Sequence, residues 1–319
     1  IGLVVLVGII KYHQDFFSSL KQIFEDKILL VLLVVGILVL GIVNFTSGWQ
    51  YGNGLDFRSS QGHDGLWHVS LMEEIKVAFP PTNPLYAGHQ LTNYHYTSDI
   101  FMGEFYRLFP FFGALDLYFR FYPIIFALLL GLGTFVFVSR HWQKQAAYYA
   151  VAFTYFCGSF GYIVSLLNHG SIFAGETTFW ASQGNTILGN PPHTLGIIIL
   201  TTILALLSVW EKTKDKVWLL FTLLLGFGLA TVKVSSGAIF AVSLLGAGFV
   251  YMLQTKKPIL LLLGIVVTIT NFIALKIISP TAQSFILFEP LWFPRTMMVV
   301  RLNWMDWELR RQHYMWVKI

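Results

Sequence analysis

The chain has 319 residues, of which 55% are hydrophobic, 17% aromatic and only 12% charged, and its formal net charge is +5. Soluble domains carry about a quarter charged residues, so this chain has too few to cover a water-facing surface. The composition excludes a soluble enzyme, a nucleic-acid-binding protein and a disordered chain, and it indicates an integral membrane protein. The single cysteine, Cys157, argues against a disulfide framework and a cysteine metal site.

Both ends of the sequence indicate an excerpt of a longer polypeptide. The chain begins without methionine, in the apolar stretch 1–10, which is shorter than the roughly 20 residues that cross a bilayer as a helix. It ends in polar, aromatic sequence, and we expect residues 276–319 to begin a further extracytoplasmic segment. Residues 1–319 are therefore interpreted as a single transmembrane domain.

Apolar runs along the chain predict an all-α fold, a polytopic bundle of transmembrane helices. Lipid offers no partners for backbone N–H and C=O groups, so a spanning segment of this composition must be helical. The runs suitable for spanning are residues 28–45, 117–138, 146–167, 195–210, 217–253 and 258–275. The run 217–253 would measure about 55 Å as one helix, nearly twice the ~30 Å of hydrocarbon. We therefore expect two legs, with a break at residues 231–237 where polar residues and a glycine interrupt the apolar pattern.

Charges in the loops predict the orientation of the bundle. Ten of the 21 Lys and Arg residues fall in the short loops 11–27, 139–145, 211–216 and 254–257. The two long loops, 46–114 and 168–194, are poorer in positive charge. Positively charged loops stay in the cytoplasm, so we expect a multi-pass protein of the cytoplasmic (inner) membrane whose long loops, and any active site, face outside.

The first long loop contains a predicted interfacial helix with a carboxylate at its start. Apolar residues at helical spacing indicate a helix over 66–79. Asp64 precedes it, either as an N-cap that accepts backbone N–H bonds or as a functional carboxylate that contacts a substrate. His68 stands one turn on, on the same helix face as Asp64. These two residues are the candidate catalytic pair.

The predicted break in the longest run places a cation near the outer membrane surface. The first leg reaches only about 22 Å, so Lys233 is expected slightly below that surface. Either it is buried in the protein or in a hydrated cavity, where it needs a partner, or it extends to the interface with its stem in lipid. His193, which follows two prolines at the start of a helix, is either a solvated helix-start residue or a substrate contact.

Histidines and a carboxylate in the first loop raise the question of a metal ion. His63, Asp64, His68 and His95 are potential ligands of a divalent ion, but none of the recognised zinc spacings is present. The need for a metal is therefore open.

Several tracts carry a resemblance to a known family. The first loop reads HDGLWH from His63, followed by PPTNPLYAG and LTNYHY. Farther on, NPPH leads into a helix at His193, and GLATVKVSSG covers the predicted break at 228–237. With a long outer loop whose acidic residue lies just beyond a membrane helix, these tracts resemble the GT-C superfamily of membrane glycosyltransferases.

The resemblance implies transfer of a sugar from a polyprenyl-phosphate donor to an acceptor hydroxyl at the extracytoplasmic face. The family's first-loop carboxylate falls on Asp64, which would act as general base beside His68. Lys233 and His193 would bind the lipid phosphate. The candidates for contacts to the sugar are Trp67, Tyr94, Tyr96, Glu176 and Trp180. The sugar, the acceptor and the oligomeric state are left open.

Two other functions compete with sugar transfer. A transporter or flippase of lipid-linked sugars also needs a hydrated cavity and a charged residue within the membrane, although transporters tend to show internal repeats, and none is evident here. A noncatalytic membrane subunit would use the aromatic outer loops as an interface.

Overall fold

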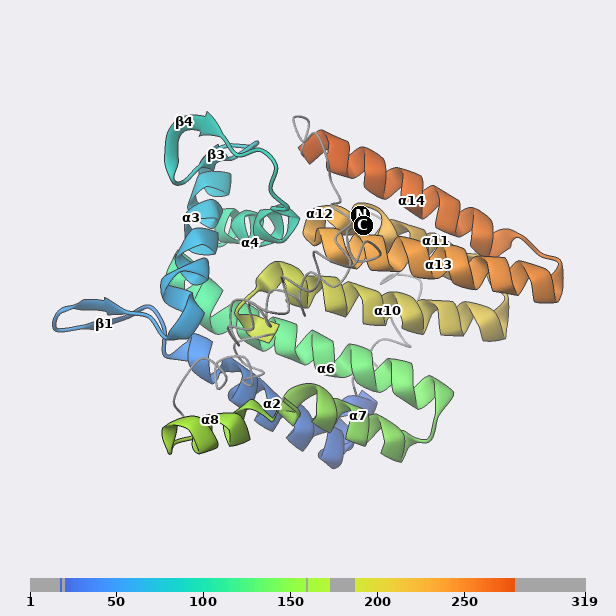
Figure 1. The fold of residues 1–319 in the computed structure, drawn as a ribbon, viewed down its shortest axis with the longest axis horizontal. Helices are drawn as coiled ribbons and strands as arrows, with labels where there is room; N and C mark the ends of the chain where they lie inside the picture. Colours follow the sequence, from blue (N-terminus) through green and yellow to red (C-terminus); the bar gives the residue numbers. More distant parts are fainter. Residues whose placement is uncertain (1–17, 19–20, 159, 173–186, 279–319) are drawn as a thin grey trace, which may run out of the picture. The chain divides into compact units, whose positions relative to one another are not determined.

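The protein is described by a computed structural model that covers residues 18, 21–158, 160–172 and 187–278. The chain divides into two compact units after Pro280, and the second unit, Thr281–Ile319, lies outside the described residues, as does most of the expected further segment 276–319. Figure 1 shows a bundle of helices with the elements of the first long loop at one end.

Six segments within the described ranges are long and apolar enough to cross a membrane. They confirm the prediction of a mostly helical, multi-pass membrane protein. The six are α2 (Lys27–Phe45); Ala114–His141, made of α5 (Ala114–Asp116), η2 (Leu117–Phe121) and α6 (Tyr122–His141); Lys144–His169, made of α7 (Lys144–Phe156) and α8 (Gly161–His169); α10 (Pro191–Thr213); α13 (Val234–Thr255); and α14 (Ile259–Ile278). A shorter apolar segment, Val217–Val232, contains α11 (Val217–Gly226) and α12 (Leu229–Val232).

The helices alternate in direction, so their connections gather at two ends of the bundle. The loops that join α6 to α7, α10 to α11 and α13 to α14 lie at one end in Figure 1, which we call the basic end. The positive residues in and next to these three loops are Arg140, Lys144, Lys212, Lys214, Lys216, Lys256 and Lys257. The first long loop lies at the other end, called the loop end. Which end faces the cytoplasm stays a prediction from loop charge.

Two β-hairpins in the first long loop were not predicted from the sequence. β1 (Trp49–Tyr51) pairs antiparallel with β2 (Gly54–Asp56), and β3 (Thr82–Asn83) pairs antiparallel with β4 (Tyr86–Gln90). The remaining elements of this loop are η1 (Ser59–Gly62), α3 (Asp64–Val77) and α4 (Thr97–Leu108). The helix α3 occupies nearly the predicted range 66–79, and its position at a membrane interface stays a prediction.

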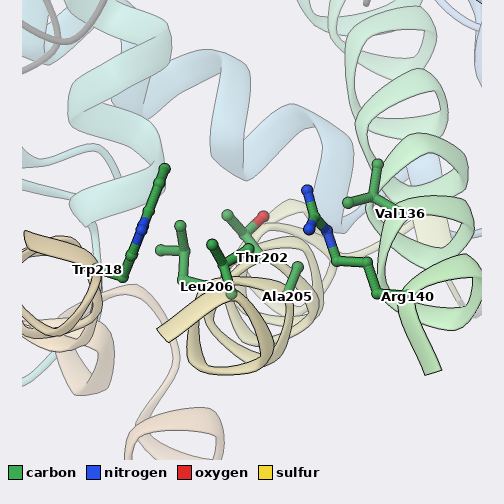
Figure 2. A pocket seen from close by; sticks show the side chains of 7 residues that line it. Val136, Arg140, Thr202, Ala205, Leu206 and Trp218 are labelled. Atoms are coloured by element: carbon green, nitrogen blue, oxygen red, sulfur yellow. The ribbon is translucent and has the colours of Figure 1, made fainter. Parts of the chain in front are cut away.

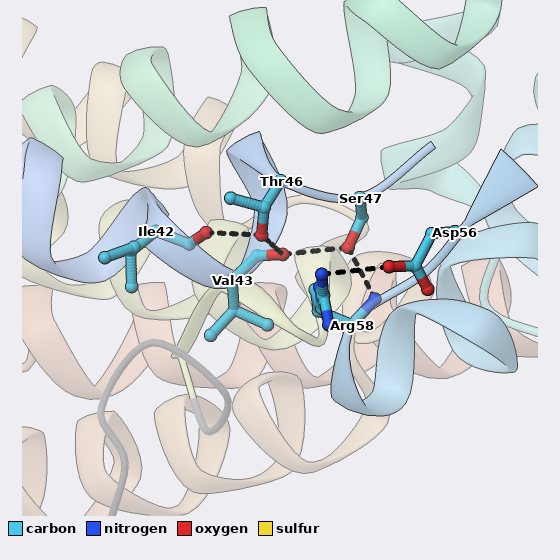
Figure 3. Close-up of polar contacts among 6 residues, drawn as sticks. All are labelled: Ile42, Val43, Thr46, Ser47, Asp56 and Arg58. Atoms are coloured by element: carbon cyan, nitrogen blue, oxygen red, sulfur yellow. Dashed lines mark hydrogen bonds and ion pairs between the residues drawn. The ribbon is translucent and has the colours of Figure 1, made fainter. Parts of the chain in front are cut away.

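The first hairpin is tied to the end of α2 by polar contacts, which Figure 3 shows. Ser47 Oγ donates to the carbonyl of Val43 at 2.8 Å and accepts from the backbone N–H of Arg58 at 3.0 Å. The guanidinium of Arg58 also pairs with Asp56 at 3.0 Å. These contacts fix where the chain leaves α2, and thereby where α3 begins.

The longest apolar run folds into two legs, as predicted, but its first leg is itself broken. The helix α11 ends at Gly226, α12 begins at Leu229, and α13 begins after Lys233. Gly228 between α11 and α12 has a φ of +73°, a conformation that side chains with a Cβ rarely adopt. The two legs approach closely, since a Cβ on Gly237 would lie 2.6 Å from the backbone N and Cα of Ala230.

A buried asparagine of α14 holds the break between α11 and α12. Asn271 is only 4% exposed. Its Nδ2 donates to the carbonyl of Gly226 at 2.8 Å, and its Oδ1 accepts from the N–H of Ala230 at 2.7 Å. Both backbone groups lie at helix ends without partners in their own helices, so the side chain satisfies groups that lipid cannot.

We expect Asn271→Leu to destabilise the fold, because it leaves these two buried backbone groups without partners. Each unsatisfied group costs about 1–3 kcal/mol of the free energy of unfolding. Thr268→Val on the same helix is the matched control, since Thr268 donates only to the carbonyl of Gly264 in its own helix. Thermal unfolding of both purified variants measures the difference, and equal stabilities would contradict this role of Asn271.

Candidate functional site

The carboxylate of Asp64 is free of the helix that it begins. Asp64 is the first residue of α3, and the N-cap is His63, which makes no capping bond with its side chain. The interpretation of Asp64 as an N-cap is therefore wrong. Its Oδ1 lies 2.6 Å from Nδ1 of the exposed His63, and its side chain is 47% exposed. The carboxylate can thus contact a substrate without giving up a backbone bond.

One turn along α3, His68 forms a buried pair with a residue of α4. Its Nδ1 lies 2.6 Å from Oδ1 of Asp99, and the two side chains are 4% and 0% exposed. Ser98 Oγ donates to the other carboxylate oxygen of Asp99 at 3.2 Å. Because an ionised carboxylate only accepts hydrogen bonds, the pair assigns the proton to Nδ1 and leaves Nε2 of a neutral His68 as an acceptor.

Tyr118 covers His68 from the adjoining membrane segment. The two rings stack with centroids 5.9 Å apart and an interplanar angle of 16°. Tyr118 lies in η2, a π-helical turn, and is 3% exposed, yet its hydroxyl has no hydrogen-bond partner within the described part of the chain. The hydroxyl of Tyr118 is therefore available as a hydrogen-bonding group next to the ring of His68.

A contact between α4 and α12 connects the first long loop to the broken helix. Thr97 Oγ1 donates to Thr231 Oγ1 at 2.7 Å. Thr97 lies two residues before Asp99, and Thr231 lies two residues before Lys233. The contact therefore brings Lys233, which follows α12, to the side of the bundle where α3 and α4 pack together.

Lys233 lies half-buried at the N-terminus of α13, where it is the N-cap residue. The helix dipole of α13 and the ammonium group therefore both favour an anion at this place. Both sequence-based interpretations of Lys233 stay predictions, since its side chain is half-buried and, within the described ranges, no carboxylate forms an ion pair with its ammonium.

The second candidate for phosphate binding, His193, lies close to Lys233. Asn190 caps α10 by accepting from the N–H of His193 at 3.2 Å. One turn later α10 passes close to α13, since a Cβ on Gly196 would lie 2.5 Å from Ser236 Oγ and 3.5 Å from Lys233 Cβ. The charge of Lys233 acts on His193, which is partly buried.

Aromatic residues after β4 lie next to the residues just described. Tyr94 meets Trp67 edge-on with centroids 5.4 Å apart, and it stacks on His95 at 4.7 Å. Burial, with the nearby ammonium of Lys233, lowers the pKa of His95 to about 4, so this ring is neutral at pH 7. Burial and the carboxylate of Asp99 raise the pKa of Tyr94, which keeps its phenol as a donor.

The remaining predicted residues differ in what the structure says of them. Tyr96 is 7% exposed and packs with Leu71 and Leu91, so its ring belongs to a small hydrophobic core next to the aromatic residues. Glu176 and Trp180 lie outside the described residues. Among the residues that are described, no three His, Cys, Asp or Glu side chains lie close enough together to hold a metal ion.

Two members of the cluster were missed by sequence reasoning. Asp99 stood out only as one of several loop carboxylates, because its partner His68 is 31 positions away. Tyr118 is part of an apolar run and has no local signal beyond being a tyrosine in a membrane segment. We call the set Asp64, His68, Tyr94, His95, Asp99, Tyr118, His193 and Lys233 the polar cluster.

Comparisons with known protein families, with curated proteins and with solved structures found no match to this chain. The proposed function therefore depends on the geometry of the polar cluster.

Proposed function

We propose that this protein is a membrane glycosyltransferase that transfers a sugar from a polyprenyl-phosphate donor to an acceptor hydroxyl at the loop end of the bundle. The observation that carries the proposal is the packing of α4 against both α3 and α12, which brings the element that bears Asp64 and the helix end that bears Lys233 to the same end of the bundle. A carboxylate and a cation on separate elements suit the two ends of a breaking sugar–phosphate bond.

In the proposed reaction, the carboxylate of Asp64 takes the proton from the acceptor hydroxyl. The oxygen of that hydroxyl attacks the anomeric carbon, and the bond from this carbon to the phosphate oxygen breaks. Nε2 of His68, held by Asp99, accepts a hydrogen bond and positions the acceptor. A positioned general base contributes typically 10²- to 10⁴-fold to the rate.

The departing polyprenyl phosphate gains negative charge and needs compensation. Lys233 and the N-terminus of α13 supply positive charge, and His193 supplies a further hydrogen-bonding group. With the ring of His95 neutral, Lys233 is the principal cation facing this phosphate. Trp67 and Tyr94 offer rings on which a sugar can stack.

The direct test is transfer from a panel of radiolabelled polyprenyl-phosphate sugars by the full-length protein in lipid vesicles. Formation of a glycosylated product, with release of unlabelled polyprenyl phosphate, supports the proposal. The panel contains several donor sugars, and each donor is tested with several classes of acceptor. If none of the donors gave a glycosylated product, the proposal would be contradicted.

We expect Lys233→Met to weaken donor binding by about 10- to 100-fold, because hydrogen bonds to charged groups contribute about 1.5–3 kcal/mol. Lys76→Met is the matched control, since Lys76 lies on α3 with its ammonium 3.9 Å from the ring centroid of Tyr106 and outside the polar cluster. Equilibrium binding of a radiolabelled donor measures the effect. Unchanged affinity in Lys233→Met would instead assign this lysine to the membrane interface.

A transporter of lipid-linked sugars is the second candidate, and the broken segment α11–α12–α13 favours it. Discontinuous helices with a charge at the break are typical of transporter binding sites. The two functions differ in their product. Movement of the intact labelled donor across the vesicle membrane, without bond cleavage, would identify a transporter. A transferase would instead move the labelled sugar from the donor to an acceptor.

A further inference from the structure

A cavity unrelated to the polar cluster lies at the basic end. It occupies about 410 Å³ between α6, α10 and α11. Figure 2 shows Val136 and Arg140 of α6 on one side, Trp218 of α11 on the other, and Leu206 of α10 between them. Cavities of this size accommodate a substantial part of a small organic ligand.

The walls are mainly apolar, but Arg140 places a fixed positive charge among them. Among the described residues, no carboxylate pairs with its guanidinium. Asp215 in the nearby loop instead accepts from Val217 N–H, at the start of α11, at 3.0 Å. Lys212 Nζ donates to the carbonyl of Arg140 at 2.7 Å, which brings a second cation to the same rim. The cavity therefore combines an apolar interior with a cationic edge.

This combination is complementary to an amphiphile with an anionic head. The cavity lies beside two membrane-spanning segments, those of α6 and α10, and beside the shorter apolar helix α11, near the ends of these helices at the basic end, where we expect a phospholipid headgroup. Trp218 suits such a place, because tryptophan is enriched at membrane interfaces. An acyl chain would contact Val136, Leu206 and Trp218, while the phosphate would contact Arg140.

We propose that this cavity, which we call the lipid groove, binds one anionic phospholipid from the leaflet at the basic end, with Arg140 as the main contact to its phosphate. The proposal is independent of sugar transfer. Each Lys or Arg near an anionic membrane surface changes lipid affinity by about fivefold, and a seated phosphate should exceed this.

The test is native mass spectrometry of the full-length protein released from nanodiscs that contain equal amounts of phosphatidylglycerol and phosphatidylcholine. We expect one retained phosphatidylglycerol per chain in preference to phosphatidylcholine. Arg140→Gln should reduce the retained phosphatidylglycerol by about fivefold or more. Lys257→Gln is the matched control, because it removes a positive charge from the same end without lining the groove.

A second variant tests the apolar part of the groove. Val136→Trp places a large side chain in the cavity, and Val136 is 38% exposed, so the fold has room for the change. It should reduce retention of both lipids. Equal retention of the two lipids by the wild type, or retention unaffected by Arg140→Gln and Val136→Trp, would overturn the proposal. Retention of a second copy of the chain in place of lipid would also overturn it.

Discussion

Asp64→Asn is expected to reduce sugar transfer by about 10²- to 10⁴-fold, the usual contribution of a positioned general base. The amide keeps the size of the side chain but cannot take the proton of the acceptor hydroxyl. The side-chain carboxylate of Asp64 accepts no backbone N–H bond of α3, so the fold should be retained. Donor binding should change little, because Lys233 is intact. Initial rates at saturating donor measure the effect.

The control for this substitution is Asp56→Asn in the same loop. Asp56 pairs with Arg58 in the first hairpin and lies outside the polar cluster, so the transfer rate should remain near that of the wild type. A normal rate in Asp64→Asn would eliminate Asp64 as the base. A loss of the same size in both variants would indicate a general effect of the loop rather than proton transfer.

The second large effect is expected for Asp99→Asn, with a loss of about 10²-fold in transfer rate. Asp99 is a positioning residue, because it acts through His68. An amide offers an N–H to Nδ1 of His68, which favours the tautomer that carries the proton on Nε2. His68 then loses the acceptor that holds the substrate hydroxyl.

Two measurements separate this role from simple destabilisation. The pH profile of transfer should change in Asp99→Asn, whereas a purely structural defect would lower the rate equally at all pH values. Ser98→Ala is the control, since its hydroxyl makes only a 3.2 Å bond to Asp99 and the His68–Asp99 pair remains in place. An unchanged pH profile together with a wild-type rate would remove Asp99 from the site.

Six of the eight residues of the polar cluster could be selected from the sequence, Tyr94 and His95 among them as ring residues of the tract LTNYHY. Asp64, His68, Lys233 and His193 stood out by local features: a helix start, helical spacing, a break in an apolar run and an entrance to a helix. Their proximity was not derivable, because it depends on the Thr97–Thr231 contact and on the close approach of α10 to α13 at Gly196.

Other features had no local signal at all. The pairing of His68 with Asp99 joins two helices of the first loop, and Tyr118 reaches the same place from a membrane segment. Asn271 lies within an apolar run, where nothing in the sequence indicates that it satisfies backbone groups of another helix. The loop hairpins are only a few residues long, and their alternation is too short to distinguish them from turns.

The sequence by itself determined that this protein is a helical, multi-pass membrane protein and that its longest apolar run must bend. These properties follow from desolvation of the backbone and from the thickness of a bilayer, which act on each segment separately. Only the tertiary structure decided that the carboxylate of Asp64 is free of its helix, that His68 has a buried partner and that α4 contacts α12 close to Lys233. Those outcomes depend on packing between segments distant in the chain, and no local pattern of residues encodes such contacts.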